Sequence, residues 1–370
     1  MSFKKITIAG AGTLGSQIAF QAAFYGFTVS IWNPHPDRAI RRLNKVQKMY
    51  KQEMGITDSD VKRAMKNIVE ITNDMEIATK NTEYVIESVP ENLEIKGIFY
   101  QKMCQVLPKD VILASNSSTL VPSQLVKFVD RPEKFLHMHF ANHIWKFNTS
   151  EIVGNEKTDK EVIDKVVEFA KEINMLPIVL KKEQSGYIMN SLSVPYLNAA
   201  LGLWAKGVAD PMTIDKDWMK ATGSPMGPFM SLDAIGLRTT YAIFNAHAED
   251  AAAKAIADKL KQMIDEGHYG IEAGEGFYKY PHPAYESADF LNAQSVRPQA
   301  AERMTQTTHI SGNSSPRKSR PGTHQPYSQV PETCKTKCRP EELHQMPDAA
   351  PVSEPVRTAA RPYPLQNQST

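Results

Sequence analysis

A glycine-rich hexapeptide near the N-terminus constrains the fold of this chain more than any other feature. Gly10-Ala11-Gly12-Thr13-Leu14-Gly15 follows the β-branched run 5–9 and opens an amphipathic segment. In such a setting the first glycine permits a tight turn, the second lets the backbone approach a pyrophosphate, and the third lets a helix pack closely on a strand. The motif predicts a βαβ unit that binds a dinucleotide. The expected cofactor contacts are Gly10, Gly12, Thr13, Leu14 and Gly15.

The residue that ends the second predicted strand bears on the choice of cofactor. An acidic side chain at this position would bind the adenosine ribose of NAD, and this chain has Asn33. An amide can hydrogen-bond a ribose hydroxyl, but it does not repel a 2′-phosphate, and His35 and Arg38 lie nearby in the sequence. We expect Asn33 to contact the cofactor, with NAD as that cofactor and NADP as the alternative.

The segments around the motif alternate between strand-like and helix-like patterns. Short apolar runs predict strands at 4–9, 28–32, 68–72, 84–88, 111–114, 135–140 and 177–180, and the amphipathic stretches between them predict crossover helices. From Gly186 the pattern indicates helices only, at 187–206, 212–221, 229–249 and 252–266. We therefore predict an α/β fold, with a Rossmann-type doubly wound sheet over residues 1–184 and an all-α second domain over residues 185–293.

The last 77 residues differ in composition from the rest. Residues 294–370 contain 11 of the 24 prolines, no Phe and no Trp, and 10 basic against 6 acidic residues, so they carry +4. The residues before them carry 33 basic and 35 acidic side chains, a net charge of −2. A segment with little to bury and no periodicity is predicted to be a disordered tail.

Charge and hydropathy limit the partners that can be expected. The chain has 43 basic and 41 acidic residues, which gives no reason to expect a nucleic acid partner. No apolar run approaches the roughly 18 residues that cross a bilayer. The N-terminus enters a strand-like run almost at once, so we expect no secretory or transit peptide. Three cysteines cannot form a disulfide framework for a chain of this size, so we expect a cytoplasmic protein.

Polar side chains gather where the later strands of the predicted sheet end. The run Ser115-Asn116-Ser117-Ser118-Thr119 follows a strand at the carboxyl edge, where ligands bind in this architecture. His137 and His139 alternate along the next strand and share a face. Histidine is the side chain most easily used as a base near neutral pH, and Glu151 lies 12 residues beyond His139. The two histidines could instead form a metal pair, but hydride transfer to a nicotinamide needs no metal, so we expect none.

Further motifs occur along the chain in one order. They are Val85-Ile86-Glu87-Ser88-Val89-Pro90-Glu91-Asn92-Leu93, Ala114 to Ser118, His139-x-x-Asn142, Gly186-x-x-x-Asn190, Pro225-Met226-Gly227-Pro228 with Leu232-Asp233 and Gly236-Leu237, and Gly274 to Tyr280. Together with the glycine motif, they make residues 3–282 resemble the 3-hydroxyacyl-CoA dehydrogenase family, including the short bacterial 3-hydroxybutyryl-CoA dehydrogenases.

The resemblance implies a role for each matching residue. His139 is expected to take the proton of the substrate 3-hydroxyl group, while Glu151 holds the other ring nitrogen. Ser118 and Asn190 are expected to hydrogen-bond the reacting oxygen. The family contacts to the cofactor fall on Glu91, Lys96, Ser118 and Asn142, and Asn142 also shapes the pocket. The resemblance further implies an acyl-CoA substrate and a homodimer formed through the helical domain.

One segment departs from the family pattern. Where the family has proline and an aliphatic run, this chain has residues 143–150, which the resemblance places beside the acyl group. Two alternatives therefore accompany the acyl-CoA reading: a dehydrogenase of a free hydroxy acid, of the gulonate or carnitine type, and an NADH-binding protein without turnover. The basic helix that carries Arg38, Arg41, Arg42, Lys45 and Lys48 is interpreted either as a site for coenzyme A phosphates or as a solvated face.

Overall fold

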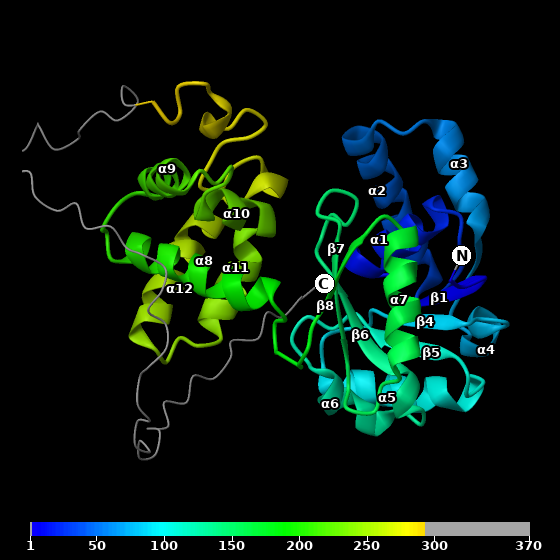
Figure 1. Cartoon of the computed structure of the whole chain (residues 1–370). Helices are drawn as coiled ribbons and strands as arrows, with labels where there is room; N and C mark the ends of the chain where they lie inside the picture. Colours follow the sequence, from blue (N-terminus) through cyan, green and yellow to red (C-terminus); the bar gives the residue numbers. More distant parts are fainter. Residues whose placement is uncertain (1, 293–370) are drawn as a thin grey trace, which may run out of the picture. The chain divides into compact units, whose positions relative to one another are not determined.

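The structure, a computed structural model, describes residues 2–292 (Figure 1). The predicted disordered tail lies outside these described residues. None of the helices within residues 2–292 combines the length and the apolar character that crossing a bilayer requires.

Eight strands form one sheet in the order β3-β2-β1-β4-β5-β6-β7-β8. The strands are β1 (Lys5–Ala9), β2 (Thr28–Trp32), β3 (Ile68–Thr72), β4 (Tyr84–Glu87), β5 (Ile112–Ser115), β6 (Phe135–Phe140), β7 (Thr149–Gly154) and β8 (Leu176–Val179). Neighbouring strands are parallel, except that β7 runs antiparallel to β6. The strand order reverses between β1 and β4, which is the point where sheets of this kind bind ligands.

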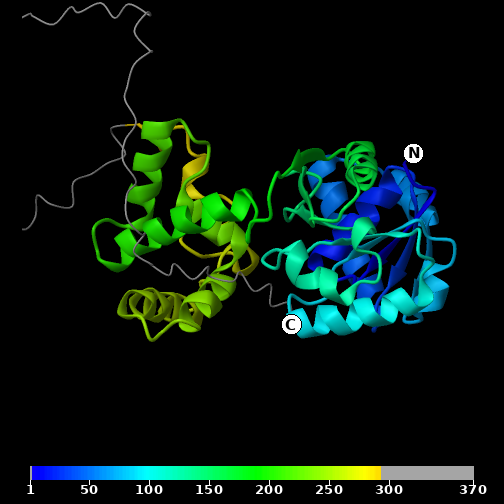
Figure 2. The same cartoon turned by 60° about the horizontal axis from the view of Figure 1, so that its bottom comes forward.

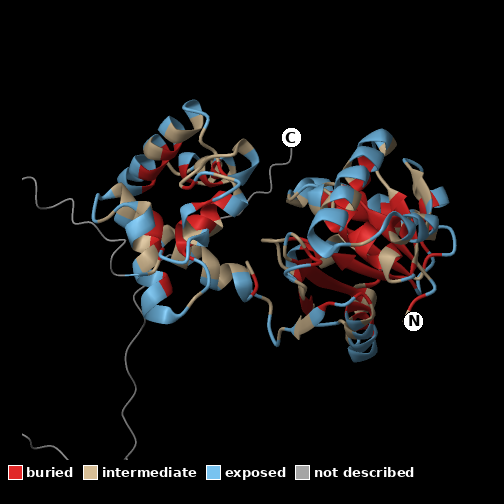
Figure 3. Cartoon of the chain, turned by 90° about the horizontal axis from the view of Figure 1, so that it is seen from above, coloured by how far each residue is buried: buried red, intermediate tan, exposed pale blue. Residues whose placement is uncertain are grey.

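Helices cover both faces of the sheet, as Figures 1 and 2 show. On one face lie α1 (Thr13–Phe24), α2 (Pro36–Met54), α3 (Asp58–Asn67) and α7 (Lys160–Glu172), and on the other lie α5 (Leu93–Val106) and the short α6 (Pro122–Leu125). A short helix, α4 (Met75–Thr79), follows β3. Strand side chains alternate between two apolar clusters, with Ile6 and Ile8 in one and Val85 and Leu113 in the other. The inner strands are consequently buried between the helical layers (Figure 3), whereas the edge strands β3 and β8 contain no buried residue.

The second domain is entirely helical in the described range. It contains α8 (Met189–Ala205), α9 (Pro211–Thr222), α10 (Pro228–Ile235), α11 (Leu237–Asn245) and α12 (Ala251–Asp265), followed by short 3-10 turns. Phe229, Leu237 and Leu260 lie fully inside its apolar core. The predicted fold class, a doubly wound sheet followed by an all-α domain, is confirmed.

Several elements differ from the sequence prediction, among them the short helices α4 and α6, which were not expected. The single helix expected at 229–249 is two helices, because Gly236 between α10 and α11 has a φ of 94° and interrupts the helical backbone. Helix α3 was not expected, although Thr57 and Asp60 form a capping box at its N-terminus. Strand β7 was seen only as an apolar run around Glu151.

Two buried carboxylates give the motifs of the helical domain a structural role. Asp215 accepts hydrogen bonds from the backbone N–H groups of Phe229 and Met230 and from the Tyr278 hydroxyl, at 2.8, 3.0 and 2.8 Å. Burial raises the pKa of Asp215 to about 6, despite these hydrogen bonds. Asp233 binds the backbone of the 274–280 turn in the same manner, through Phe277 and Tyr278.

Candidate active site

The turn between β1 and α1 has the shape that a pyrophosphate requires. A Cβ atom on Gly10, whose φ is 98°, would lie 2.6 Å from the Ser88 carbonyl oxygen, and one on Gly15 would lie 1.9 Å from the Gly10 carbonyl oxygen. Around Gly12, by contrast, a Cβ would meet no heavy atom within 4 Å. Helix α1 begins after Gly12 without a side-chain cap, so its first N–H groups are available to an anion. These features fit a dinucleotide bound at this turn.

Asn33 and Arg42 both contact this turn. The Asn33 side chain accepts a hydrogen bond from the Ala11 N–H at 3.1 Å and donates one to the His35 carbonyl oxygen at 2.7 Å. Arg42, from the basic flank of α2, donates to the Thr13 hydroxyl at 2.8 Å. The rest of that flank is exposed. Asn33 therefore ties the end of β2 to the glycine turn. Arg42 belongs to the basic flank identified from the sequence, and its contact with Thr13 is a feature that the sequence did not predict.

A buried ion pair lies beside the end of β4. Glu87 is 0% exposed and accepts hydrogen bonds from Lys96 Nζ at 2.6 Å, Ser115 Oγ at 2.7 Å and Tyr100 Oη at 3.1 Å. The ammonium group of Lys96 also lies 3.4 Å from Glu91 Oε2. Lys96, implied above as a cofactor contact, thus has its charge engaged by two carboxylates inside the protein, where it is 1% exposed. Glu87 is a member of this network that sequence reasoning missed.

Glu91 fixes the loop that carries Ser118. Its Oε1 accepts hydrogen bonds from Ser117 Oγ at 2.5 Å and from the N–H groups of Ser118 and Thr119 at 3.0 and 2.8 Å. Burial alone would raise the pKa of Glu91, but Lys96 and these hydrogen bonds lower it to about 2. The carboxylate therefore stays ionised and holds Ser118 at the carboxyl edge of the sheet.

His139 and Glu151 face each other across β6 and β7. They are directly paired in the antiparallel register, and His139 Nδ1 lies 3.0 Å from Glu151 Oε2. Both are buried, with 4% and 5% exposed area. The hydrogen bonds from His139, Met189 and Ile188 outweigh the effect of burial and lower the pKa of Glu151. A carboxylate that accepts the Nδ1–H leaves the lone pair on Nε2, the state that a general base needs.

Of the two predicted asparagines, Asn142 follows β6 and Asn190 lies in the first turn of α8. Glu151 Oε1 accepts the N–H groups of Ile188 and Met189, both at 2.9 Å, so the carboxylate also binds the start of α8. Asn190 is the next residue of that first turn. Asn142 follows β6, and its side-chain oxygen accepts a hydrogen bond from Gln17 Nε2 at 2.6 Å. The sheet thus brings Ser118, His139 and Glu151 to neighbouring strands, and Gln17 links Asn142 to α1.

The segment 143–150 has a structural role that the sequence did not indicate. Ile144 and Trp145 are 0% and 5% exposed and belong to the core between the sheet and α2. Trp145 packs against Tyr50, with ring centroids 4.5 Å apart and planes tilted by 49°, and its Nε1–H donates to Glu53 at 3.0 Å. These two residues therefore do not line an acyl site, contrary to what the resemblance implied for the segment as a whole.

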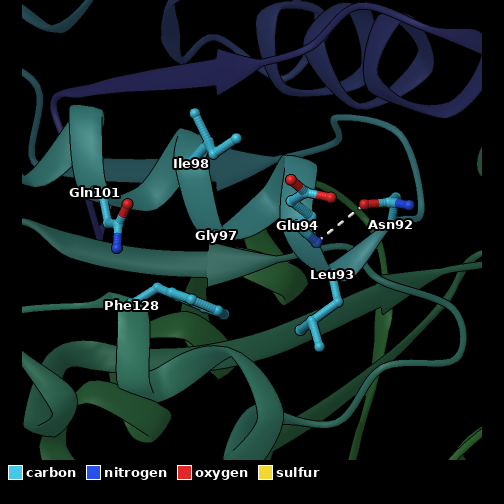
Figure 4. A pocket seen from close by; sticks show the side chains of 7 residues that line it. All are labelled: Asn92, Leu93, Glu94, Gly97, Ile98, Gln101 and Phe128. Carbon is cyan, nitrogen blue, oxygen red and sulfur yellow. Dashed lines mark hydrogen bonds between the residues drawn. The ribbon is translucent and has the colours of Figure 1, made fainter.

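A separate open cavity of about 440 Å³ lies at the start of α5 (Figure 4). It is lined by Asn92, Leu93, Glu94, Gly97, Ile98, Gln101 and Phe128. None of the candidate catalytic residues is among them, so this cavity is not the reaction centre.

Comparison with known proteins identifies the family. The model of the 3-hydroxyacyl-CoA dehydrogenase NAD binding domain matches residues 5–184, and that of the 3-hydroxyacyl-CoA dehydrogenase C-terminal domain matches residues 186–280. The mitochondrial hydroxyacyl-coenzyme A dehydrogenase of Homo sapiens is 29% identical over 290 residues, which cover 75% of this chain and 91% of the human protein.

Two solved structures are similar over nearly the same part of the chain. A diketoreductase, described as acting on dicarbonyl compounds, is 44% identical, with a TM-score of 0.71 and coverage of 76% of this chain and 100% of that one. An (S)-3-hydroxybutyryl-CoA dehydrogenase from Ralstonia eutropha is 25% identical, with a TM-score of 0.63 and the same coverage. The matched N-terminal model agrees with NAD as the cofactor. This chain belongs to the 3-hydroxyacyl-CoA dehydrogenase family, whose members are NAD-dependent oxidoreductases.

Proposed function

We propose that this protein transfers hydride between NAD(H) and C3 of a short-chain (S)-3-hydroxyacyl-CoA, forming or consuming the 3-ketoacyl-CoA. The observation that carries the proposal is the buried His139–Glu151 pair, 3.0 Å apart and joined across two strands of the sheet that carries the dinucleotide motif. A base with a fixed tautomer beside a nicotinamide site suits the oxidation of an alcohol.

The residues of the chain have distinct tasks in this mechanism. A nicotinamide bound in this domain would supply the acceptor, or the donor, of the hydride at C3. His139 Nε2 accepts the proton of the 3-hydroxyl group during oxidation and gives it back to the ketone oxygen during reduction. Glu151 keeps the proton of the resting imidazole on Nδ1 and stabilises the imidazolium ion that forms. Ser118 and Asn190 are proposed to hydrogen-bond the reacting oxygen, and Asn142 to border the nicotinamide.

The test combines a substrate with a histidine variant. Purified protein is expected to oxidise NADH with acetoacetyl-CoA, and His139→Gln is expected to abolish turnover while NADH affinity, measured by fluorescence titration, stays nearly unchanged. His282→Gln, at an exposed position in the helical domain, is the matched control and should retain full activity. Turnover by His139→Gln at the wild-type rate would refute the assignment of the base.

A second candidate substrate follows from the comparisons. The similar diketoreductase, at 44% identity, acts on dicarbonyl compounds according to its description. A 3-ketoacyl-CoA is also a dicarbonyl compound, with a ketone two carbons from a thioester carbonyl, so the His139 chemistry serves both. A panel of acetoacetyl-CoA, free hydroxy acids and free or esterified diketones, each with NAD(H) and NADP(H), separates the two. Activity on the free compounds alone would move the proposal to the hydroxy acid alternative, and NADH binding without any turnover would favour the non-catalytic one.

We propose that the helical domain also mediates a homodimer. Large apolar side chains of this domain are exposed in the described chain, among them Leu192 at 70%, Val208 at 65%, Ile235 at 49% and Trp218 at 39%. Sedimentation equilibrium measures the mass of the assembly directly. A monomer at micromolar concentration would contradict this proposal without affecting the catalytic one. The cytoplasmic location stays a prediction.

A further inference from the structure

Tyr187 occupies an unusual place just before α8. Its side chain is 1% exposed, although it belongs to the segment between the two domains. Its backbone φ is 53°, in the left-handed region that a bulky residue rarely adopts. A strained backbone that persists at a candidate active site calls for contacts that hold it there.

The ring of Tyr187 lies flat against the imidazole of His139. The ring centroids are 4.6 Å apart, and the planes differ by 1°. The hydrogen bond to Glu151 fixes one point of the imidazole, His139 Nδ1. Rotation of a histidine ring about its second side-chain torsion is otherwise only broadly restricted. A parallel aromatic surface removes this remaining freedom, so the two contacts together define the position of Nε2.

The hydroxyl group of Tyr187 locks the ring in place. It donates its single hydrogen to the Ser117 carbonyl oxygen at 2.7 Å. The hydroxyl oxygen also lies 3.0 Å from His137 Nδ1. Because the only hydroxyl hydrogen is already donated, the oxygen must accept a hydrogen bond here, so His137 Nδ1 carries the hydrogen. Burial lowers the pKa of His137 to about 3, consistent with a neutral ring. His137, whose Nε2 has no hydrogen-bond partner within the described residues, thus serves as a donor to Tyr187.

We infer that Tyr187 is a positioning residue for His139. Its ring holds the plane of the imidazole, and its hydroxyl, oriented by His137, fixes the loop next to Ser118. This inference rests on the proposed role of His139 as the base.

The test uses three variants assayed with acetoacetyl-CoA and NADH. Tyr187→Leu removes the ring and is expected to lower kcat about 100-fold, the usual result of misplacing a catalytic group by about 1 Å. KM and the NADH Kd should change less than about threefold, because the substrate and cofactor contacts remain. Tyr187→Phe keeps the ring but removes the hydroxyl that anchors it, so kcat should fall by only about fivefold, the effect of one hydrogen bond of about 1 kcal/mol. Tyr84→Leu is the control for lost packing, because Tyr84 is also fully buried and stacks on Phe3.

A spectroscopic measurement separates this inference from the proposed function. The ring current of a stacked aromatic shifts the His139 ring protons, so their NMR resonances should be displaced in wild type and Tyr187→Phe and return towards ordinary positions in Tyr187→Leu. Equal losses of kcat in Tyr187→Leu and Tyr84→Leu would overturn the inference, as would a Tyr187→Leu variant with wild-type kcat. Inactivity of the wild-type protein with every substrate, with the displaced resonances present, would instead refute the proposed function.

Discussion

Replacing Glu151 with glutamine tests whether its carboxylate sets the tautomer of His139 while it also binds the start of α8. Three donors converge on its two oxygens: His139 Nδ1–H on Oε2, and the N–H groups of Ile188 and Met189 on Oε1. Glutamine supplies one oxygen and one NH2 group. The two backbone donors are fixed, so the oxygen is expected to stay with them and the NH2 group to face His139. The imidazole must then accept at Nδ1 and carry its hydrogen on Nε2, the tautomer that cannot act as a base.

The size of the effect follows from the contacts that are lost. A hydrogen bond to a charged group contributes about 1.5–3 kcal/mol, which corresponds to roughly 10- to 100-fold in rate. The wrong tautomer adds at least about another tenfold, because Nε2 no longer accepts a proton. We therefore expect Glu151→Gln to lower kcat by about 1,000-fold. NADH affinity should stay within about threefold of wild type, since Glu151 does not contact the glycine turn.

The assay is steady-state oxidation of NADH with acetoacetyl-CoA, alongside fluorescence titration of NADH. Glu183→Gln is the control, because Glu183 also accepts a backbone N–H, that of Ser123 at 2.8 Å, but does not contact His139. A Glu151→Gln variant with kcat within tenfold of wild type would show that the carboxylate is not needed to set the tautomer. A parallel loss of NADH affinity would show that the substitution had disturbed the fold.

Other positions give independent tests. Gly12→Ala should fold normally, since a Cβ at Gly12 meets no atom within 4 Å. The added methyl group should nevertheless raise the NADH Kd at least about tenfold, because it occupies the space near the pyrophosphate. An unchanged Kd in a fluorescence titration would show that the phosphates bind elsewhere. Lys96→Met leaves the Glu87 carboxylate buried without its cation. It should therefore lower the free energy of unfolding, measured with urea, by about 3–5 kcal/mol. A decrease below about 1 kcal/mol would contradict this prediction. Burial raises the pKa of Asp215 in the folded state from 3.8 to about 6, so the folded protein binds a proton at Asp215 more tightly than the unfolded chain does. The stability that this proton contributes to the fold is fully present below about pH 4 and is lost as the pH rises through about 6. The Tm of the wild-type protein should thus rise from pH 7.5 to pH 5, and it should rise less in Asp215→Asn. Identical Tm profiles against pH in the two proteins would refute the raised pKa of Asp215.

The sequence predicts the parts of this fold that depend on local patterns. The glycine turn, the seven expected strands and the start of the helical domain follow from residues that are neighbours along the chain. The contacts that define the site depend instead on pairing between strands. Nothing local indicates that Lys96 is buried between Glu87 and Glu91, or that Tyr187 stacks on His139. The division of 229–249 into two helices did have a local signal, Gly236.

The antiparallel direction of β7 explains how His139 and Glu151 meet across only 12 residues. Parallel neighbours need a crossover of about a dozen or more residues, usually with a helix, before the chain returns to the same edge of the sheet. Here β6 reaches its carboxyl end and the chain turns back directly through residues 141–148. The burial of Ile144 and Trp145 anchors this connection against α2, while the register of β6 and β7 places the two catalytic candidates opposite each other. Exposed positions of the connection, such as Phe147 at 50%, are therefore free to vary with the substrate without moving the His139–Glu151 pair.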